Sequence, residues 1–109
     1  MNDFLKTSHL SELLEKSEKE PVVIFKFSSE CNSSAKLKAS FLEYMEKGLL
    51  KNPVYLVTVQ EQPVLSKSIG EMFQTKHESP QVFIIKNFKL IWTEHHKNIT
   101  LEKIIKNLQ

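Results

Sequence analysis

The sequence predicts an α/β protein in which helices cover both faces of a mixed four-stranded β-sheet. Segments with helical periodicity alternate with short apolar strand-like segments in the order α-β-α-β-α-β-β-α. A helix joins the first two strands, so they should be parallel and connected by a right-handed crossover. The last two strands are separated by a tight turn and should form an antiparallel hairpin. Helices on both faces of such a sheet bury its two apolar surfaces.

The chain has 109 residues, and we expect residues 1–109 to form a single domain. With 40% apolar residues and a net charge of only +2, its composition is typical of a folded protein. Apolar runs such as Val22 to Phe25 are far shorter than the ~20 residues of a membrane-spanning helix. The segment Met1 to Leu10 lacks the apolar core of a signal peptide. We therefore expect no membrane association, and a single cysteine indicates the reducing cytoplasm.

The first helix should begin at Ser8, a residue type that caps helices, and fade in the charged run Glu15 to Glu20. Pro21 then stops the helix. Its apolar side carries Leu10, Leu13 and Leu14. The first strand follows at 22–27, and its nearly continuous apolar character predicts burial on both faces.

The polar segment 28–34 separates this strand from a second helix. The predicted apolar face of that helix consists of Ala35, Ala39, Leu42, Met45 and Leu49. A second strand is expected at 54–59, and Pro63 suits the first turn of a third helix. The apolar stripe of the third helix consists of Leu65, Ile69, Met72 and Phe73.

A polar loop at 75–80 precedes a third strand at 82–85. Asn87 and Phe88 form the turn to a fourth strand at 90–92. Thr100 should cap the last helix. The apolar face of this helix carries Leu101, Ile104, Ile105 and Leu108.

The basic residues argue against a nucleic-acid partner. All 15 are lysine, and the chain contains no arginine. Arginine supplies the planar fork that binds guanine edges and phosphates through two hydrogen bonds. The lysines form no clustered basic stripe, so we expect no nucleic acid to bind. With only Gly48 and Gly70, the chain also lacks a glycine-rich phosphate-binding loop.

Cys31 is the first candidate for chemistry, because it lies between a buried strand and the start of a helix. The free N–H groups and partial positive charge of a helix N-terminus favour a thiolate, and cysteine pKa values fall to ~3.5–7.5 at such positions. One turn later, Ser34 can donate a hydrogen bond to the sulfur. Glu30 opposes the thiolate, whereas Lys26 and Lys36 can offset it. The alternative is an inert buried cysteine, but the polar neighbours favour a reactive thiol.

The second candidate is Ser79-Pro80, which stands directly before the third strand. The order of elements, with a Cys-x-x-Ser motif at a helix start and X-Pro before the third strand, resembles that of a thioredoxin-like fold. This fold is a three-layer α/β/α sandwich, and the resemblance covers nearly the whole chain. In detail the sequence is similar to the monothiol bacilliredoxin family. The residues that carry this similarity are Phe25-Lys26, Ser28, Cys31-x-x-Ser34, Leu56-Val57, Val59-Gln60-Glu61, Lys76-His77-Glu78-Ser79-Pro80-Gln81, Trp92, His96, Ile99 and Thr100.

The resemblance implies a thiol–disulfide oxidoreductase that removes bacillithiol from protein mixed disulfides. Bacillithiol joins cysteine to glucosamine malate and carries several carboxylates. In the implied reaction the Cys31 thiolate takes the bacillithiol from a bacillithiolated client protein, and a second bacillithiol then resolves the Cys31 adduct. Bacillithiol is thus a co-substrate, and no bound cofactor is implied. Since Cys31 is the only cysteine, an intramolecular resolving step is impossible.

In the resembled fold, further residues gather at the Cys31 end of the sheet. The backbone of Ser79, before Pro80, would pair with the substrate chain. His77 or His96 would favour the thiolate or carry a proton to the leaving thiolate. Lysines at this end, Lys26, Lys36 or Lys97, would attract bacillithiol carboxylates. Beside the catalytic pair Cys31 and Ser34, the expected substrate-binding residues are Ser79, Pro80, His77, His96, Asn32 and Lys36.

Three alternatives remain open at this point. The family usually has Cys-Pro-Ile-Ser, whereas this chain has Cys31-Asn32-Ser33-Ser34, which favours a non-enzymatic thioredoxin-like binding or redox-sensing module. Some monothiol glutaredoxins share an iron–sulfur cluster through a Cys-Gly-Phe-Ser motif, which Asn32 and Ser33 do not match. One cysteine and nearby histidines can in principle hold zinc, but no pair has the usual ligand spacing, so we expect no metal site.

Overall fold

The computed structural model describes residues 3–109, so residues 1–2 of the expected domain lie outside the description. The predicted order of elements and the α/β class are confirmed. The elements are α1 (Leu10–Lys19), β1 (Val22–Phe27), α2 (Asn32–Glu46), β2 (Val54–Thr58), α3 (Pro63–Phe73), β3 (Gln81–Lys86), β4 (Lys89–His95), a short 3₁₀ turn (His96–Asn98) and α4 (Leu101–Leu108). Within residues 3–109, no helix is long and apolar enough to cross a membrane.

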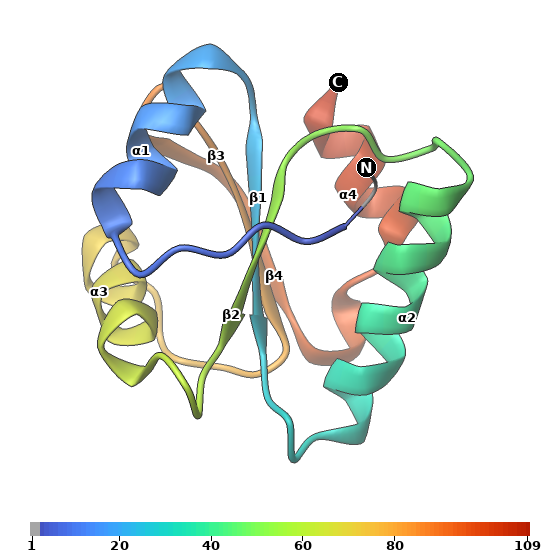
Figure 1. The fold of residues 1–109 in the computed structure, drawn as a ribbon, viewed down its shortest axis with the longest axis horizontal. Helices are drawn as coiled ribbons and strands as arrows, with labels where there is room; N and C mark the ends of the chain where they lie inside the picture. The colour runs from blue at the N-terminus through green and yellow to red at the C-terminus, as the bar shows by residue number, and fades with distance from the viewer. Residues whose placement is uncertain (1–2) are drawn as a thin grey trace.

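The four strands form one mixed sheet in the order β2-β1-β3-β4. As predicted, β1 pairs in parallel with β2, and β3 and β4 form an antiparallel hairpin. β1 also pairs antiparallel with β3, so it has a neighbour on each side. Figure 1 shows the sheet between two helical layers, with α1 and α3 on one side and α2 and α4 on the other. This arrangement is the predicted three-layer α/β/α sandwich.

The central strand β1 builds a core on each face of the sheet. Alternate side chains of a strand point to opposite faces, so Val23 and Phe25 pack in the core beneath α2 and α4. Val22 and Ile24 pack in the other core, beneath α1 and α3. In the first core the Phe25 ring stacks on Phe41 of α2, with ring centroids 4.9 Å apart. These contacts attach α2 firmly to the strand that precedes it.

The start of α1 differs from the prediction. His9, not Ser8, occupies the position before the helix, and its side chain makes no capping hydrogen bond. The Thr7 hydroxyl instead accepts a hydrogen bond from the His9 backbone N–H, at 3.1 Å. The helix ends at Lys19, within the charged run and before Pro21, as expected. Lysines in the last turn interact favourably with the negative end of the helix dipole.

The predicted apolar face of α2 is wrong in part: Met45 is buried and Leu42 packs against the core, but the other three residues do not. Ala35 and Ala39 are exposed, and Leu49 lies beyond the helix end and is 56% exposed. The buried face consists of Ser34, Leu37, Phe41 and Met45. This face begins with Ser34, a polar residue that an apolar pattern does not include. The pattern therefore favoured a set of residues on an adjacent face of the helix. On α3, Met72 of the predicted stripe is likewise exposed.

The hairpin is longer than predicted, because β4 continues past Trp92 to His95. Gln81, at the start of β3, pairs with His95 at the end of β4. Such pairing joins residues distant in the sequence and is not visible in a local pattern. The extension carries the end of β4 to the edge of the sheet where β1 also ends, since Gln81 also pairs with Lys26.

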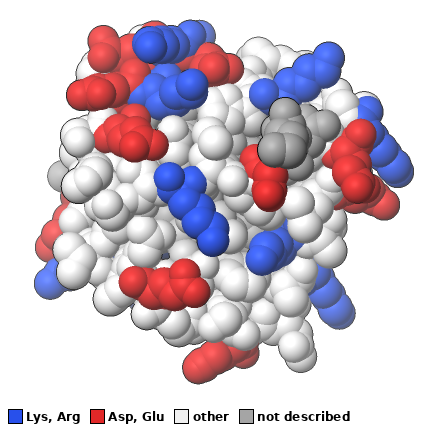
Figure 2. Space-filling model, viewed as in Figure 1, with Lys and Arg blue, Asp and Glu red and all other residues white. Residues whose placement is uncertain are grey.

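The view in Figure 2 shows lysine and acidic side chains interspersed over one face of the molecule. No continuous basic stripe crosses this face, in keeping with a net charge of only +2. An extended stripe of one sign would be needed to follow a phosphate backbone. The visible face therefore offers no such surface.

Replacing Phe41 with alanine should lower the free energy of unfolding by about 3–5 kcal/mol, because it removes a fully buried ring from the contact between α2 and β1. Chemical denaturation followed by circular dichroism measures this change. The matched control is Phe88→Ala, since Phe88 is 44% exposed and should cost within about 0.5 kcal/mol. Equal losses for both variants would contradict the described core.

Candidate active site

The strand β1 and the helix α2 together position Cys31. Cys31 is the residue immediately before α2, with an extended backbone and a half-buried side chain. Its backbone N–H donates to the Ser28 carbonyl at 3.3 Å, and its carbonyl accepts from the Ala35 N–H at 3.2 Å. The first bond closes the turn after β1 and the second begins the helix. The sulfur therefore lies at a helix N-terminus, as the sequence predicts.

Hydrogen-bond donors at this helix start lower the pKa of the Cys31 thiol. The backbone N–H of Ser34 has the largest effect, while partial burial acts in the opposite direction. The Ser34 hydroxyl and the N–H and hydroxyl of Ser33 lower the pKa further. These donors stabilise the thiolate more than the thiol. The expected contributions of Glu30, Lys26 and Lys36 are not among the causes of this shift.

Ser34 is held in place by the turn after β1. Its side chain is fully buried, and its Oγ accepts a hydrogen bond from the Ser28 backbone N–H at 3.2 Å. With that lone pair occupied, the hydroxyl proton remains available for another acceptor. The Cys31 sulfur is such an acceptor, since the Ser34 hydroxyl contributes to its lowered pKa. This arrangement also explains why a serine starts the buried face of α2.

A glutamine that sequence analysis did not single out as a site residue clamps the same turn. Gln60 follows β2, and its Nε2 donates to the Ser28 hydroxyl at 2.7 Å. Its Oε1 accepts from the Ser29 backbone N–H at 3.1 Å. Because β1 and β2 are parallel, their carboxyl ends lie side by side. The position of Gln60 directly after the second predicted strand could therefore have indicated a contact with the turn after the first.

The second part of the site is the 75–80 loop, which reaches the sulfur through its last peptide bond. The Ser79-Pro80 bond is cis. The Ser79 carbonyl oxygen lies 4.0 Å from Cys31 Sγ, within reach of a weak thiol hydrogen bond. Pro80 is buried, and the Ser79 hydroxyl is buried without a hydrogen-bond partner among residues 3–109. The structure thus brings Cys31, Ser34, Ser79 and Pro80 together.

Gln81 braces this loop and is a further residue without a predicted role. It is 3% exposed at the start of β3. Its Oε1 accepts from the Glu78 backbone N–H at 3.3 Å, and its Nε2 donates to the Lys76 carbonyl at 3.2 Å. A polar residue at the start of an otherwise apolar strand was the signal for this role. The two bonds fix the loop that carries Ser79.

His96 lies beside the same loop, but its ring pairs with a carboxylate. Its backbone N–H donates to the Pro80 carbonyl at 2.9 Å, and its Nε2 lies 2.6 Å from Glu78 Oε1. The hydrogen bond with His96 is the main reason that the pKa of Glu78 is below its ordinary value. The structure therefore brings His96 to the loop, with Glu78 as its partner.

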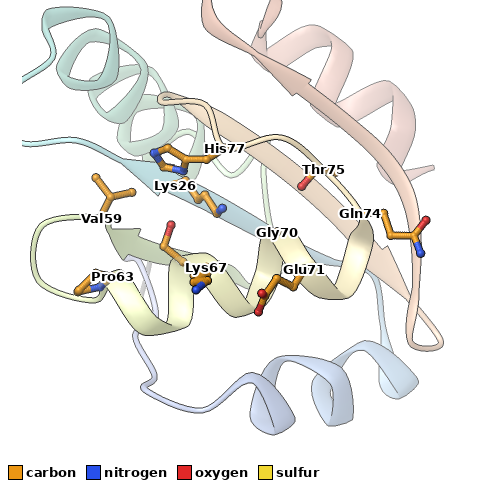
Figure 3. Close-up of a pocket in the computed structure, with 10 residues that line it drawn as sticks. Lys26, Val59, Pro63, Lys67, Gly70, Glu71, Gln74, Thr75 and His77 are labelled. Carbon is orange, nitrogen blue, oxygen red and sulfur yellow. The ribbon is translucent and has the colours of Figure 1, made fainter.

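The other predicted substrate-binding residues lie farther out. Asn32 and Lys36 are exposed, on the first and second turns of α2. His77 is exposed and lines a pocket on the α3 side of the sheet (Figure 3). Within residues 3–109, no group of three His, Cys, Asp or Glu side chains is arranged to hold a metal ion.

Lys26 was expected to be able to offset Glu30, but it is not among the causes of the Cys31 pKa shift. It is 1% exposed, and its ammonium lies 5.4 Å from the centroid of the Phe83 ring. Phe83 belongs to the core beneath α1 and α3, so the Lys26 side chain points to the face of the sheet opposite α2. Burial lowers its pKa to about 8. Lys97, by contrast, is exposed after β4.

Comparison with known protein families shows to which family this chain belongs. The family described as "Monothiol bacilliredoxin BrxC" matches residues 3–104 of the chain. The chain belongs to the monothiol bacilliredoxin family. This bacilliredoxin keeps the family's Cys-x-x-Ser spacing at Cys31 and Ser34, with Asn32 and Ser33 between them. The resemblance inferred from the sequence is thus confirmed.

Solved structures confirm the thioredoxin-like fold of this bacilliredoxin. A thioredoxin-fold protein to which oxidoreductase activity is ascribed is 26% identical, with a TM-score of 0.82 over 96% of this chain and 93% of that chain. Thioredoxin from Malassezia sympodialis is 18% identical, with a TM-score of 0.76 over 99% and 92% of the two chains. Thioredoxin f from spinach chloroplast is 16% identical, with a TM-score of 0.73 over 99% and 92%. At these last two identities the likeness shows the fold alone.

Replacing Ser34 with alanine should raise the Cys31 pKa, because a donor to the thiolate is lost. The thiolate fraction at neutral pH then falls, and alkylation by iodoacetamide should slow roughly threefold to tenfold. The pH dependence of thiolate ultraviolet absorbance measures the shift directly. The control is Ser33→Ala, whose hydroxyl is the weakest of the named donors and whose shift should be smaller. An unchanged titration in Ser34→Ala would contradict the donor role.

Proposed function

We propose that this protein removes bacillithiol from protein mixed disulfides by thiol–disulfide exchange at Cys31. The observation that carries the proposal is the position of the sulfur, at the start of α2 and 4.0 Å from the Ser79 carbonyl. Its thiol pKa is lowered by neutral donors, and its side chain is half-buried rather than enclosed. A thiolate with access to solvent is what exchange requires. Membership in the bacilliredoxin family supports bacillithiol as the small thiol.

In the proposed reaction, the Cys31 thiolate attacks the bacillithiol sulfur of a client mixed disulfide. The client–bacillithiol bond breaks, and the client cysteine leaves as a thiolate that takes up a proton. The new bond is a disulfide between Cys31 and bacillithiol. The thiolate of a second bacillithiol then attacks the bacillithiol sulfur of this adduct, which restores Cys31 and releases bacillithiol disulfide. An external thiol is required, because Cys31 is the only cysteine in the chain.

The neighbouring groups have distinct proposed roles. The Ser79 backbone, beside the sulfur and before cis-Pro80, pairs with the extended client chain. His96, held by Glu78, supplies a proton to the departing client thiolate. Asn32, on the exposed first turn of α2, contacts the substrate at the rim of the site.

Lys36 and His77 complete the proposed substrate-binding set as exposed groups at the same end of the fold. Lys36 attracts bacillithiol carboxylates on the α2 side, and His77 lies on the α3 side of the 75–80 loop. We place the reaction in the cytoplasm, where a reducing environment keeps a lone cysteine free and supplies the resolving thiol.

A second candidate function is redox sensing or binding without catalysis. The replacement of the family's usual Pro-Ile by Asn32-Ser33 favours it, because these residues are exposed beside the sulfur and alter the surface that clients meet. A sensor would form the Cys31 adduct but would not be restored by free bacillithiol at a useful rate. Turnover of a bacillithiolated client under excess bacillithiol separates the two functions.

The main test uses intact-mass spectrometry after incubation with bacillithiol disulfide and, in parallel, glutathione disulfide. We expect one adduct per chain, formed faster with bacillithiol and released by free bacillithiol. Cys31→Ser, a variant of nearly the same shape, should form no adduct and have no activity toward a bacillithiolated client. A folded wild-type protein that forms no adduct with either disulfide would contradict the proposal.

A further inference from the structure

The structure contains a pocket on the α3 side of the sheet, in which the exchange reaction described above involves only the exposed His77. Its volume is about 630 Å³, and it lies between α3, the end of β1 and the 75–80 loop. Lys26, Gly70, Thr75 and His77 are among the residues that line it (Figure 3). Cys31 is not among them, so the pocket does not surround the sulfur.

A buried cation forms the inner wall of this pocket. Lys26 is 1% exposed, and Figure 3 shows its side chain reaching from β1 toward α3, between His77 and Gly70. Within residues 3–109, the ion pairs involve Lys47, His95 and His96, and none involves Lys26. A buried charge is costly unless it is paired. The aromatic ring of Phe83 compensates only in part.

An unpaired hydroxyl group and a glycine lie close to this ammonium group. The hydroxyl of Thr75 is buried and has no hydrogen-bond partner among residues 3–109. Gly70 lies within α3, where alanine is the better helix former. A Cβ atom at Gly70 would lie 3.4 Å from the Thr75 carbonyl oxygen and 3.7 Å from Lys26 Nζ. The missing side chain therefore leaves room for about one methyl-sized group beside the Lys26 ammonium and the Thr75 hydroxyl, which lies 3.9 Å from the same Cβ position.

The outer wall of the pocket carries both signs of charge. Lys67 and Glu71 project from α3, and His77 lies on the opposite side, on the loop. Glu71 disfavours an anion, whereas Lys67 offsets it at the same wall. The electrostatic potential inside the pocket is then set mainly by the buried Lys26, because water screens its charge least. The pocket therefore suits a small organic group that ends in a carboxylate.

The pocket also lies within reach of a small molecule attached to the sulfur. Lys26 pairs with Gln81 across the sheet, and both Gln81 and His77 are two residues from Ser79. Two residues of extended chain span roughly 7 Å, and the Ser79 carbonyl lies 4.0 Å from Cys31 Sγ. The rim of the pocket is thus on the order of 10 Å from the sulfur. A small thiol of three linked units spans a similar distance.

We propose that this pocket binds a carboxylate of the low-molecular-weight thiol while the sulfur of that thiol reacts at Cys31. The Lys26 ammonium anchors the carboxylate, and the Thr75 hydroxyl donates a hydrogen bond to it. The inference rests on the proposed exchange at Cys31 and adds a specificity-determining residue to it. Lys26 selects carboxylated thiols over uncharged ones, from the face of the sheet opposite α2.

The test compares the rate of adduct formation at Cys31 with bacillithiol disulfide and with the uncharged hydroxyethyl disulfide. Lys26→Met keeps most of the side-chain volume and removes the charge, so the core should remain filled. We expect it to slow the reaction with bacillithiol disulfide about tenfold, the effect of losing one charged hydrogen bond. The rate with hydroxyethyl disulfide should not change. Lys89→Met, an exposed lysine at the far end of β4, should leave both rates unchanged.

Gly70→Ala provides a second variant that keeps the charge and fills the space. It should also slow the bacillithiol reaction selectively, with α3 intact. The inference is overturned if Lys26→Met and Gly70→Ala keep the wild-type ratio of the two rates, or if both rates fall equally. A wild-type protein that reacts with hydroxyethyl disulfide but not with bacillithiol disulfide overturns the proposed function instead. The two failures are therefore distinguishable.

Discussion

The burial of β1 on both faces and its pairing on both edges constrain everything else in this structure. Its ladder fixes Lys26 between Val57 of β2 and Gln81 of β3. A shift of one residue would exchange its two faces and move Phe25 out of the core beneath α2. The two ladders therefore hold the end of β1 in register, and the turn that leads to Cys31 and α2 begins there. The hydrogen bonds of Cys31 with Ser28 and Ala35 then complete its position.

The same alternation places two different chemistries on the two faces of one strand. Phe25 stacks on Phe41 and secures α2, whose first turn supplies the donors for the Cys31 thiolate. The next residue, Lys26, necessarily points the other way, into the face covered by α3. A lysine in an apolar strand weakens the core that it enters. Lys26 also lines the pocket on this face, and the carboxylate proposed to bind there would offset the cost of its buried charge.

Much of this architecture follows from the sequence, because apolar runs and helix signals act locally. The order of elements and the helix start after Cys31 were predictable from these signals, whereas the proximity of Ser79 followed from the resemblance to the thioredoxin-like fold. The buried face of α2 was not predictable, because it begins with Ser34, whose burial depends on a hydrogen bond to Ser28. The length of β4 was not either, since it depends on pairing between distant residues.

The roles of Gln60 and Gln81 were missed for a related reason. Gln60 acts on a turn 31 and 32 residues away in the sequence, and only the completed sheet brings the two together. The polar side chain of Gln81 at the start of an apolar strand was a signal, but the loop atoms to which it hydrogen-bonds, the Glu78 N–H and the Lys76 carbonyl, were not apparent from that pattern. A local sequence pattern predicts the secondary structure of a segment. It does not predict the hydrogen-bond partners of its polar side chains when those partners are distant in the sequence.

The way in which the thiolate is stabilised suits a protein with one cysteine. Neutral donors, rather than a cation, lower the pKa of Cys31, and a short hydrogen bond is screened less by salt than a distant charge. A very acidic thiol would be a poor nucleophile, because nucleophilicity falls with pKa, yet it would leave readily from the adduct. In the proposed exchange, a single sulfur both attacks the client disulfide and leaves when an external thiol resolves the adduct. The lowered pKa, set by N–H and hydroxyl groups at a helix start, favours the thiolate form in both roles.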